Sequence, residues 1–199
     1  MPKTPKNFYI FRHGECPLNV SGRIQGQTFD GELTEKGRAQ ARRAGRKLQN
    51  KNIEIIVSSP MKRARQTAAI VASYVKAPIV FDDRLKEVNM GIVEGMHISE
   101  VEKKYKGIYL KWRDCRLEDT TTRFENGETK AEVRQRILEV LNHYAEETDY
   151  ICIGVSGHGI TISQTLLSLG IRKYDIPNGS VMHLTYRGHN WNYNGFVED

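Results

Sequence analysis

The sequence has few cysteines and no long apolar run, and both absences narrow the class of protein. Three cysteines occur in 199 residues, Cys16, Cys115 and Cys152, and none belongs to a CxxC pair. A scattered, odd set argues against a disulfide framework and a zinc knuckle, and favours reduced thiols. No stretch approaches the roughly 18 apolar residues of a membrane span, and the opening MPKTPKNF lacks the apolar part of a signal peptide. We therefore expect a cytoplasmic protein that does not associate with membranes.

The histidines and the basic residues also lack patterns that would mark particular ligands. No HxH, HxxxH or HExxH spacing, as used by metallohydrolases, occurs among the six histidines. The formal net charge is +6, much of it in residues 38–51, but no aromatic side chain is interleaved there as in proteins that bind single-stranded nucleic acid. At helical spacing these arginines share one face, which we interpret as solvated, with an RNA-binding patch as the alternative. We expect no metal, no cofactor and no nucleic acid partner.

What the sequence contains is an alternation of short apolar runs and amphipathic stretches. The hydrophobic content of 39% and the charged content of 27% fit a globular protein large enough to bury a core. Strands that alternate with helices imply a mostly parallel sheet covered on both faces, so the predicted fold class is α/β, a three-layer α/β/α sandwich. The predicted strands are 9–11, 53–59, 79–82 and 149–157, and the predicted helices are 32–51, 60–75, 129–148 and 160–170.

Several residues mark where these helices begin and end. Thr34 is the expected N-cap of its helix, the helix 129–148 is expected to begin at Thr129, and Pro60 is expected at the first position of its helix. Gly170 is expected to end the last helix.

Residues 91–128 interrupt the alternation, because they are polar, irregular and only partly helical. We interpret them as an insertion over the sheet's edge rather than an independent domain, so that residues 1–199 form one domain. The chain then closes with a predicted hairpin around residues 187–189.

Polar and charged residues stand where the predicted strands end. The first strand runs into Arg12-His13-Gly14, and the last parallel strand runs into Ser156-Gly157-His158-Gly159. In parallel sheets, ligands bind beyond the carboxyl ends of the strands. The helix after Pro60 opens with Lys62, Arg63 and Arg65, although a helix N-terminus disfavours cations. An anion held there explains this choice, since helix N-termini and arginine forks bind phosphate, and the alternative is that these side chains turn to solvent.

Two histidines and two arginines at one rim suit the chemistry of a phosphoryl group. A neutral imidazole is a nucleophile near pH 7. Two guanidiniums and one imidazolium supply the positive charge that the transferring group needs, without a metal. The departing alcohol needs a proton, for which Glu87 is the best candidate. The competing carboxylates are Asp82, Asp83 and Glu94.

Five sequence blocks in order resemble the histidine phosphatase superfamily, also called the phosphoglycerate mutase-like family. RHGECPLN and RIQGQTFDGELTEKGRAQA match its opening motifs, and SSPMKRARQTA, LKEVNMGIVEGM and GHG follow in the family's order. The resemblance covers nearly the whole chain. It implies a phosphoglycerate mutase-like fold with the insertion over the active site.

The resemblance also implies roles for particular residues. His13 is the expected nucleophile that forms phosphohistidine, and Glu87 is the expected general acid and later the base that activates water. The side chains expected to hold the phosphoryl oxygens are Arg12, Arg63 and His158, and those expected to line the phosphate or substrate site are Asn19, Gln25, Gly26 and Gly159.

Three positions depart from the family's pattern. Cys16 replaces the common Ser or Thr, Gly157 precedes His158 where Ser, Thr or Ala is usual, and Val93 stands where many phosphatase relatives have an aromatic residue. A Cys16 nucleophile is a rival that we disfavour, because no separate histidine is left to activate it. Val93 bears on the substrate pocket more than on the chemistry.

The sequence therefore predicts a metal-independent phosphomonoesterase that acts through phosphohistidine on a small phosphorylated metabolite, as a monomer or homodimer. Asn126-Gly127-Glu128-Thr129 resembles the end of the insertion in phosphatase relatives. A cofactor-dependent phosphoglycerate mutase is the alternative, and a non-catalytic phospho-ligand or RNA-binding protein is an alternative of another class. The basic residues of the insertion that could grip a mutase substrate are Lys103, Lys104, Lys111 and Arg113.

Overall fold

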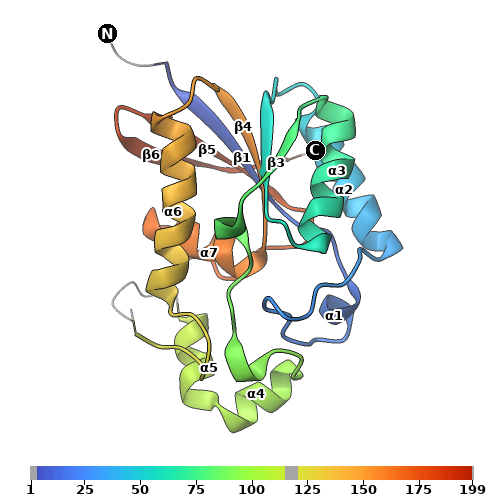
Figure 1. The fold of residues 1–199 in the computed structure, drawn as a ribbon, viewed down its shortest axis with the longest axis vertical. Coiled ribbons are helices and arrows are strands. Elements are labelled where there is room, and N and C mark those ends of the chain that lie inside the picture. The colour runs from blue at the N-terminus through green and yellow to red at the C-terminus, as the bar shows by residue number, and fades with distance from the viewer. Residues whose placement is uncertain (1–3, 115–120, 199) are drawn as a thin grey trace.

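A six-stranded sheet lies between two layers of helices in the computed structural model, which describes residues 4–114 and 121–198 (Figure 1). The strand order is β3-β2-β4-β1-β5-β6. Strands β1, β2, β3 and β4 run parallel to one another, and β5 and β6 form an antiparallel hairpin beside β1. This arrangement confirms the predicted mostly parallel sheet of an α/β/α sandwich. The strands are β1 (Lys6–Arg12), β2 (Ile55–Ser58), β3 (Ile79–Phe81), β4 (Cys152–Gly157), β5 (Val181–Arg187) and β6 (Asn190–Phe196).

The helices cover both faces of this sheet. In Figure 1, α2 and α3 lie on one side and α6 and α7 on the other. The short helices α1, α4 and α5 gather at the opposite end from the chain's N-terminus. The helices are α1 (Pro17–Val20), α2 (Glu35–Leu48), α3 (Lys62–Val75), α4 (Ile98–Lys104), α5 (Lys106–Arg113), α6 (Lys130–Glu146) and α7 (Gly159–Ser168), with 3-10 turns at Asp83–Leu85 and Gly91–Val93. Within the described residues, no helix has the length and apolar character needed to cross a membrane.

Strand β1 shows why an uninterrupted apolar run forms the centre of the sheet. Successive side chains of a strand point to opposite faces. Phe8 and Ile10 pack into the core under α6 and α7, whereas Tyr9 and Phe11 pack into the core under α2 and α3. Both faces are covered, so every position of the run is apolar.

Most of the predicted helix ends are correct. Thr34 accepts a hydrogen bond from the Gly37 amide at 3.0 Å, and Thr129 shares a capping box with Glu132. Gly170 follows α7 with a φ of +78°, a conformation that glycine adopts without strain. The prediction for Pro60 was wrong, because α3 begins two residues later at Lys62.

The described parts of the insertion, residues 91–114 and 121–128, lie beyond the carboxyl ends of the parallel strands, where Figure 1 shows α4 and α5. The expectation that it covers a sheet edge was therefore wrong, and the expectation from the family resemblance, that it covers the candidate active site, fits this placement. The edge strand β3 leaves Val80 37% and Phe81 53% exposed.

Candidate active site

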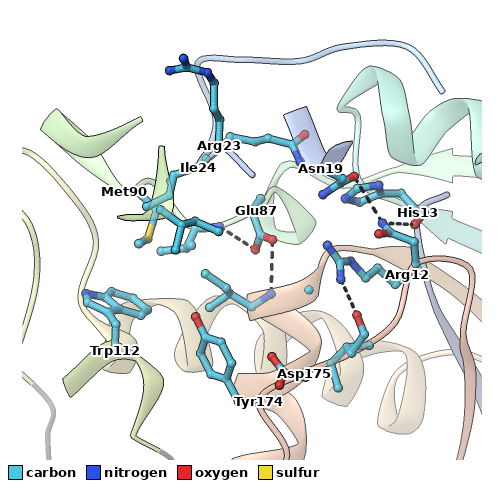
Figure 2. A pocket seen from close by; sticks show the side chains of 18 of the residues that line it. Arg12, His13, Asn19, Arg23, Ile24, Glu87, Met90, Trp112, Tyr174 and Asp175 are labelled. Carbon is cyan, nitrogen blue, oxygen red and sulfur yellow. Dashed lines mark hydrogen bonds between the residues drawn. The ribbon is translucent and has the colours of Figure 1, made fainter. Parts of the chain in front are cut away.

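A cavity of about 420 Å³ opens at the carboxyl ends of β1 and β4 (Figure 2). Eight of the nine site residues expected from the sequence line it, and the ninth, His158, lies against His13 with the ring centres 5.2 Å apart. The eight are Arg12, His13, Asn19, Gln25, Gly26, Arg63, Glu87 and Gly159.

His13 is buried, and its hydrogen bond identifies the ring nitrogen that is free to react. Nδ1 lies 2.7 Å from the carbonyl oxygen of Gly14. A carbonyl only accepts, so Nδ1 carries the hydrogen and Nε2 keeps its lone pair. Burial, followed by the charges of Arg12 and Arg63, lowers the pKa of His13 well below its usual value. His13 is therefore a neutral imidazole at pH 7.

A close contact with helix α2 holds His13 in place. The Gly14 amide donates to the Thr67 hydroxyl at 3.0 Å. A Cβ at Gly14 would lie 2.2 Å from the carbonyl oxygen of Gly37 in α2, so only glycine permits this approach. The RHG block thus joins the end of β1 to the start of α2.

Arg12 and Arg63 bring two buried guanidiniums to the cavity. Arg12 Nη1 donates to the Ile176 carbonyl, and Arg63 Nη2 donates to the Gly26 carbonyl at 2.9 Å. In each side chain, Nε is buried and has no hydrogen-bond partner among the described residues. A Cβ at Gly159 would lie 3.2 Å from Arg12 Cζ, so Gly159 leaves room for this guanidinium. Buried donors that lack an acceptor are expected where an anionic ligand binds.

The N-terminus of α3 differs from the expectation of a bound anion. The Asp30 carboxylate accepts from the Lys62 amide at 2.5 Å and pairs with Arg63 Nη1 at 3.1 Å. A carboxylate of the chain itself therefore satisfies this helix end. Lys62 pairs with Glu32 at 3.0 Å, and Arg65 lies over the Phe81 ring. Of the three basic residues only Arg63 reaches the cavity.

His158 is fully buried beside His13. Its Nε2 lies 2.8 Å from the Ser59 hydroxyl, and its Nδ1 has no partner among the described residues. Burial, followed by the charge of Arg63, lowers the pKa of His158 well below its usual value. The sequence reasoning took one imidazole of the site as an imidazolium, but these surroundings favour the neutral form of both rings. A phosphoryl dianion beside His158 would raise its pKa again.

Glu87 lies at the centre of the cavity view, 9% exposed (Figure 2). Its Oε1 accepts from the amides of Val88 and Thr161 at 3.0 and 3.2 Å, and its Oε2 accepts from the Ile160 amide at 3.3 Å. These amides belong to its own loop and to the start of α7. The carboxyl group is thus held in one orientation across from His13.

The competing carboxylates have other partners. Asp82 binds Arg84 at 2.7 Å, and Asp83 binds Lys86 at 2.9 Å. Glu94 accepts from three backbone amides, those of Gln27, Thr28 and Met90. None of Asp82, Asp83 and Glu94 lines the cavity. The geometry therefore favours Glu87 among the four candidates.

Arg136 of α6 holds the loop that carries Glu87, and the sequence reasoning missed it. It donates to the carbonyls of Arg84 and Lys86 at 2.6 Å each and to the Glu87 carbonyl at 3.1 Å. Glu128 orients the guanidinium with contacts of 2.8 and 3.0 Å. The motif Asn126-Gly127-Glu128 before α6 contains the partner of Arg136, but the loop that Arg136 holds lies about 40 residues earlier in the chain, so the sequence alone does not connect the two.

Cys16 and Val93 are both buried and neither lines the cavity. The Cys16 thiol lies 2.9 Å from Gln25 Oε1 and 3.0 Å from Asn19 Oδ1. Burial raises the pKa of this thiol, which keeps it protonated and weakens it as a nucleophile. Cys16 therefore orients two residues of the cavity wall.

The remaining histidines lie outside the cavity. His97 is the N-cap of α4 and bonds to Ser99 at 2.7 Å. His143, His183 and His189 lie on α6, on β5 and in the hairpin turn.

The family model "Histidine phosphatase superfamily (branch 1)" matches residues 8–199. The chain belongs to this superfamily. The match confirms the family and the enzyme type predicted from the sequence, a phosphomonoester hydrolase of the phosphoglycerate mutase-like type.

Relatives of known sequence and structure agree with this membership. The chain is 32% identical over 196 residues to a protein named probable phosphoglycerate mutase GpmB from Shigella boydii, covering 95% of this chain and 89% of that protein. The solved structure of Bacillus stearothermophilus YhfR is similar to this chain, with 28% sequence identity, a TM-score of 0.83 and 96% of each chain covered. A mycobacterial glucosyl-3-phosphoglycerate phosphatase in complex with VO3 is 26% identical with a TM-score of 0.79, covering 98% of this chain and 100% of that one.

Proposed function

We propose that the protein is a metal-independent phosphomonoesterase that passes the phosphoryl group of a small phosphorylated substrate to His13 and then to water. The observation that carries this proposal is that His13 is buried and neutral and keeps a lone pair on Nε2, in a cavity that Arg12 and Arg63 also line. A nucleophile beside fixed cations is what phosphoryl transfer requires.

In the first step, Nε2 of His13 attacks phosphorus, and the bond between phosphorus and the ester oxygen breaks. Arg12, Arg63 and His158 bind the phosphoryl oxygens, and Glu87 gives its proton to the departing alkoxide. In the second step, the Glu87 carboxylate takes a proton from water, whose oxygen attacks phosphorus. The bond to His13 breaks, inorganic phosphate leaves, and Glu87 is protonated again.

The fate of the phosphoenzyme separates this proposal from a phosphoglycerate mutase, the activity in the name of the Shigella relative. A mutase has to hold a second anionic group of its substrate. Of the basic residues of the insertion, Lys103, Lys104 and Lys111 are exposed and outside the cavity lining. Arg113 lines the cavity, but its guanidinium lies over the rings of Tyr109 and Tyr174. These placements favour transfer to water.

We therefore expect net hydrolysis when 3-phosphoglycerate is supplied with a trace of 2,3-bisphosphoglycerate. The measurement follows 2-phosphoglycerate by NMR and free phosphate by a coupled assay in the same sample. Phosphate release faster than isomerisation supports the phosphatase. Rapid isomerisation with little phosphate release would identify a mutase.

Removal of metal ions is expected to leave the activity nearly unchanged, because the two arginines supply the positive charge. The test compares kcat/KM for p-nitrophenyl phosphate before and after treatment with EDTA and desalting. Vanadate, which binds to the related mycobacterial phosphatase, is expected to inhibit in competition with substrate. Activity that EDTA abolishes and that Zn²⁺ or Mg²⁺ restores would contradict the proposal.

Replacement of Arg136 is expected to slow turnover without weakening substrate binding. Arg136→Gln removes the contacts that hold the Glu87 loop, and a misplaced acid costs on the order of tenfold to a hundredfold in kcat. KM should change by less than about threefold, because the hydrogen bonds of Arg136 among the described residues go to the loop and to Glu128, not into the cavity. Gln135→Ala, one residue away on the same helix, serves as the control. A rise in KM at unchanged kcat would show that Arg136 does not act through Glu87.

A further inference from the structure

The cavity has two chemically different halves. Arg12 and His13 lie at one end, and Glu87 lies between that end and a wall that carries Met90, Trp112 and Tyr174 (Figure 2). A substrate whose phosphoryl group reaches His13 therefore directs its leaving group, past Glu87, toward this wall. The wall is formed by Val88, Met90, Ile98, Tyr109, Trp112 and Tyr174.

Helix α5 and the loop between α7 and β5 supply the aromatic residues of the wall. Tyr109 and Trp112 stand three residues apart on α5, so they share one side of the helix, and both are buried. Tyr174 enters from the loop between α7 and β5. Figure 2 shows its ring directed toward the middle of the cavity.

Arg113 of α5 contacts both tyrosine rings of the wall. Its guanidinium donates to the Tyr109 hydroxyl at 3.2 Å and lies 5.1 Å from the centre of the Tyr174 ring. The Asp175 carboxylate lies 4.0 Å from the same guanidinium. These contacts favour one arrangement of the rings, and an arranged wall lowers the entropic cost of binding.

The two guanidiniums of this half, Arg23 and Arg113, already have partners in the chain. Arg23, the other cation of the far half, is exposed and donates to the Gly95 carbonyl at 2.8 Å. Asp175 adds a negative charge to the lining, and a carboxylate or second phosphate of a substrate would meet it. Removing apolar and aromatic wall from water, by contrast, favours an apolar group there.

We propose that the preferred substrates are phosphate monoesters of apolar alcohols that carry a ring, with the ring packed against Trp112 and Tyr174. This inference rests on the proposed phosphatase activity and names the substrate class of the same site. It excludes phosphoglycerates as preferred substrates, because their carboxylate would face the apolar wall and Asp175.

The test uses esters that share a primary alkyl leaving group, so that differences in rate report the wall rather than the acidity of the alcohol. 2-Phenylethyl phosphate is compared with sn-glycerol 3-phosphate and 3-phosphoglycerate, with phosphate release as the readout. We expect kcat/KM for the phenylethyl ester to exceed both others by about tenfold or more, the range that an apolar pocket supplies. An equal or lower kcat/KM for the phenylethyl ester would overturn the inference.

A charge placed on the wall is expected to weaken this preference. Ile98 lines the cavity and is 39% exposed, so Ile98→Lys should not disturb the core. We expect it to lower kcat/KM for 2-phenylethyl phosphate at least about fivefold relative to 3-phosphoglycerate. Leu110→Lys is the matched control, because Leu110 is 49% exposed on the adjoining helix outside the lining. The same change in both variants would mean that net charge alone is responsible, and would overturn the inference.

Failure of this inference can be told apart from failure of the proposed function. If the protein hydrolyses none of these esters and p-nitrophenyl phosphate is also untouched, both fail. If it hydrolyses all of them and prefers 3-phosphoglycerate, the phosphatase stands and the apolar leaving group is wrong.

Discussion

His13→Ala is expected to lower kcat/KM for any phosphomonoester by about 10⁴-fold or more, because the variant lacks the atom that accepts the phosphoryl group. Among the described residues that line the cavity, His13 is the only histidine, and no cysteine, serine, threonine or lysine lines it. The measurement is steady-state hydrolysis of p-nitrophenyl phosphate, with far-UV circular dichroism to verify the fold.

Two further variants make this result specific to His13. His143→Ala removes a partly exposed imidazole that pairs with Glu147 on α6, and it should leave kcat/KM within about twofold. Cys16→Ser keeps a hydrogen-bond donor beside Gln25, and it should retain most of the activity. If Cys16→Ser loses nearly all activity and His13→Ala retains it, the nucleophile is Cys16 and not His13.

Glu87→Gln is expected to produce the second-largest loss, and its size should depend on the leaving group. For an alkyl phosphate, which needs a proton on the departing oxygen, kcat should fall by about 10²–10³-fold. p-Nitrophenolate leaves without a proton, so His13 should still be phosphorylated by p-nitrophenyl phosphate. The water step then lacks its base, and rapid mixing should show a burst of nitrophenolate equal to the enzyme, followed by slow turnover.

The control for this variant is Asp83→Asn. Asp83 is exposed and pairs with Lys86 in the same loop, so its replacement should change kcat by less than about twofold. Equal losses for alkyl and nitrophenyl esters in Glu87→Gln, with no burst, would remove Glu87 from the role of general acid.

The sheet and the residues at its strand ends were predictable from the sequence, because local patterns determine them. Phe8 to Phe11 form an apolar run that only a strand covered on both faces explains. Arg12 and His13 follow that run directly, so their place beyond the strand end comes from chain continuity. The N-cap Thr34 and the helix start near Thr129 are likewise local, since each threonine accepts a hydrogen bond from an amide three residues later.

The contacts that orient the site were not predictable, because they join distant parts of one sequence. Asp30 reaches α3 across more than 30 residues, and Arg136 reaches the Glu87 loop across about 50. A single sequence carries no signal for such pairs beyond the residue types. The start of α3 was misjudged for this reason, since the Asp30 carboxylate satisfies the helix at Lys62.

The measurement that tests the central claim most directly is the identification of the phosphorylated residue. Glu87→Gln is mixed with p-nitrophenyl phosphate, quenched under alkaline denaturing conditions that preserve phosphohistidine, digested and sequenced by mass spectrometry. We expect one phosphate per chain, on His13, lost on brief acid treatment and absent from the double variant with His13→Ala. Phosphate on Cys16, or a protein that turns over substrate without any trapped phosphate, would contradict the account.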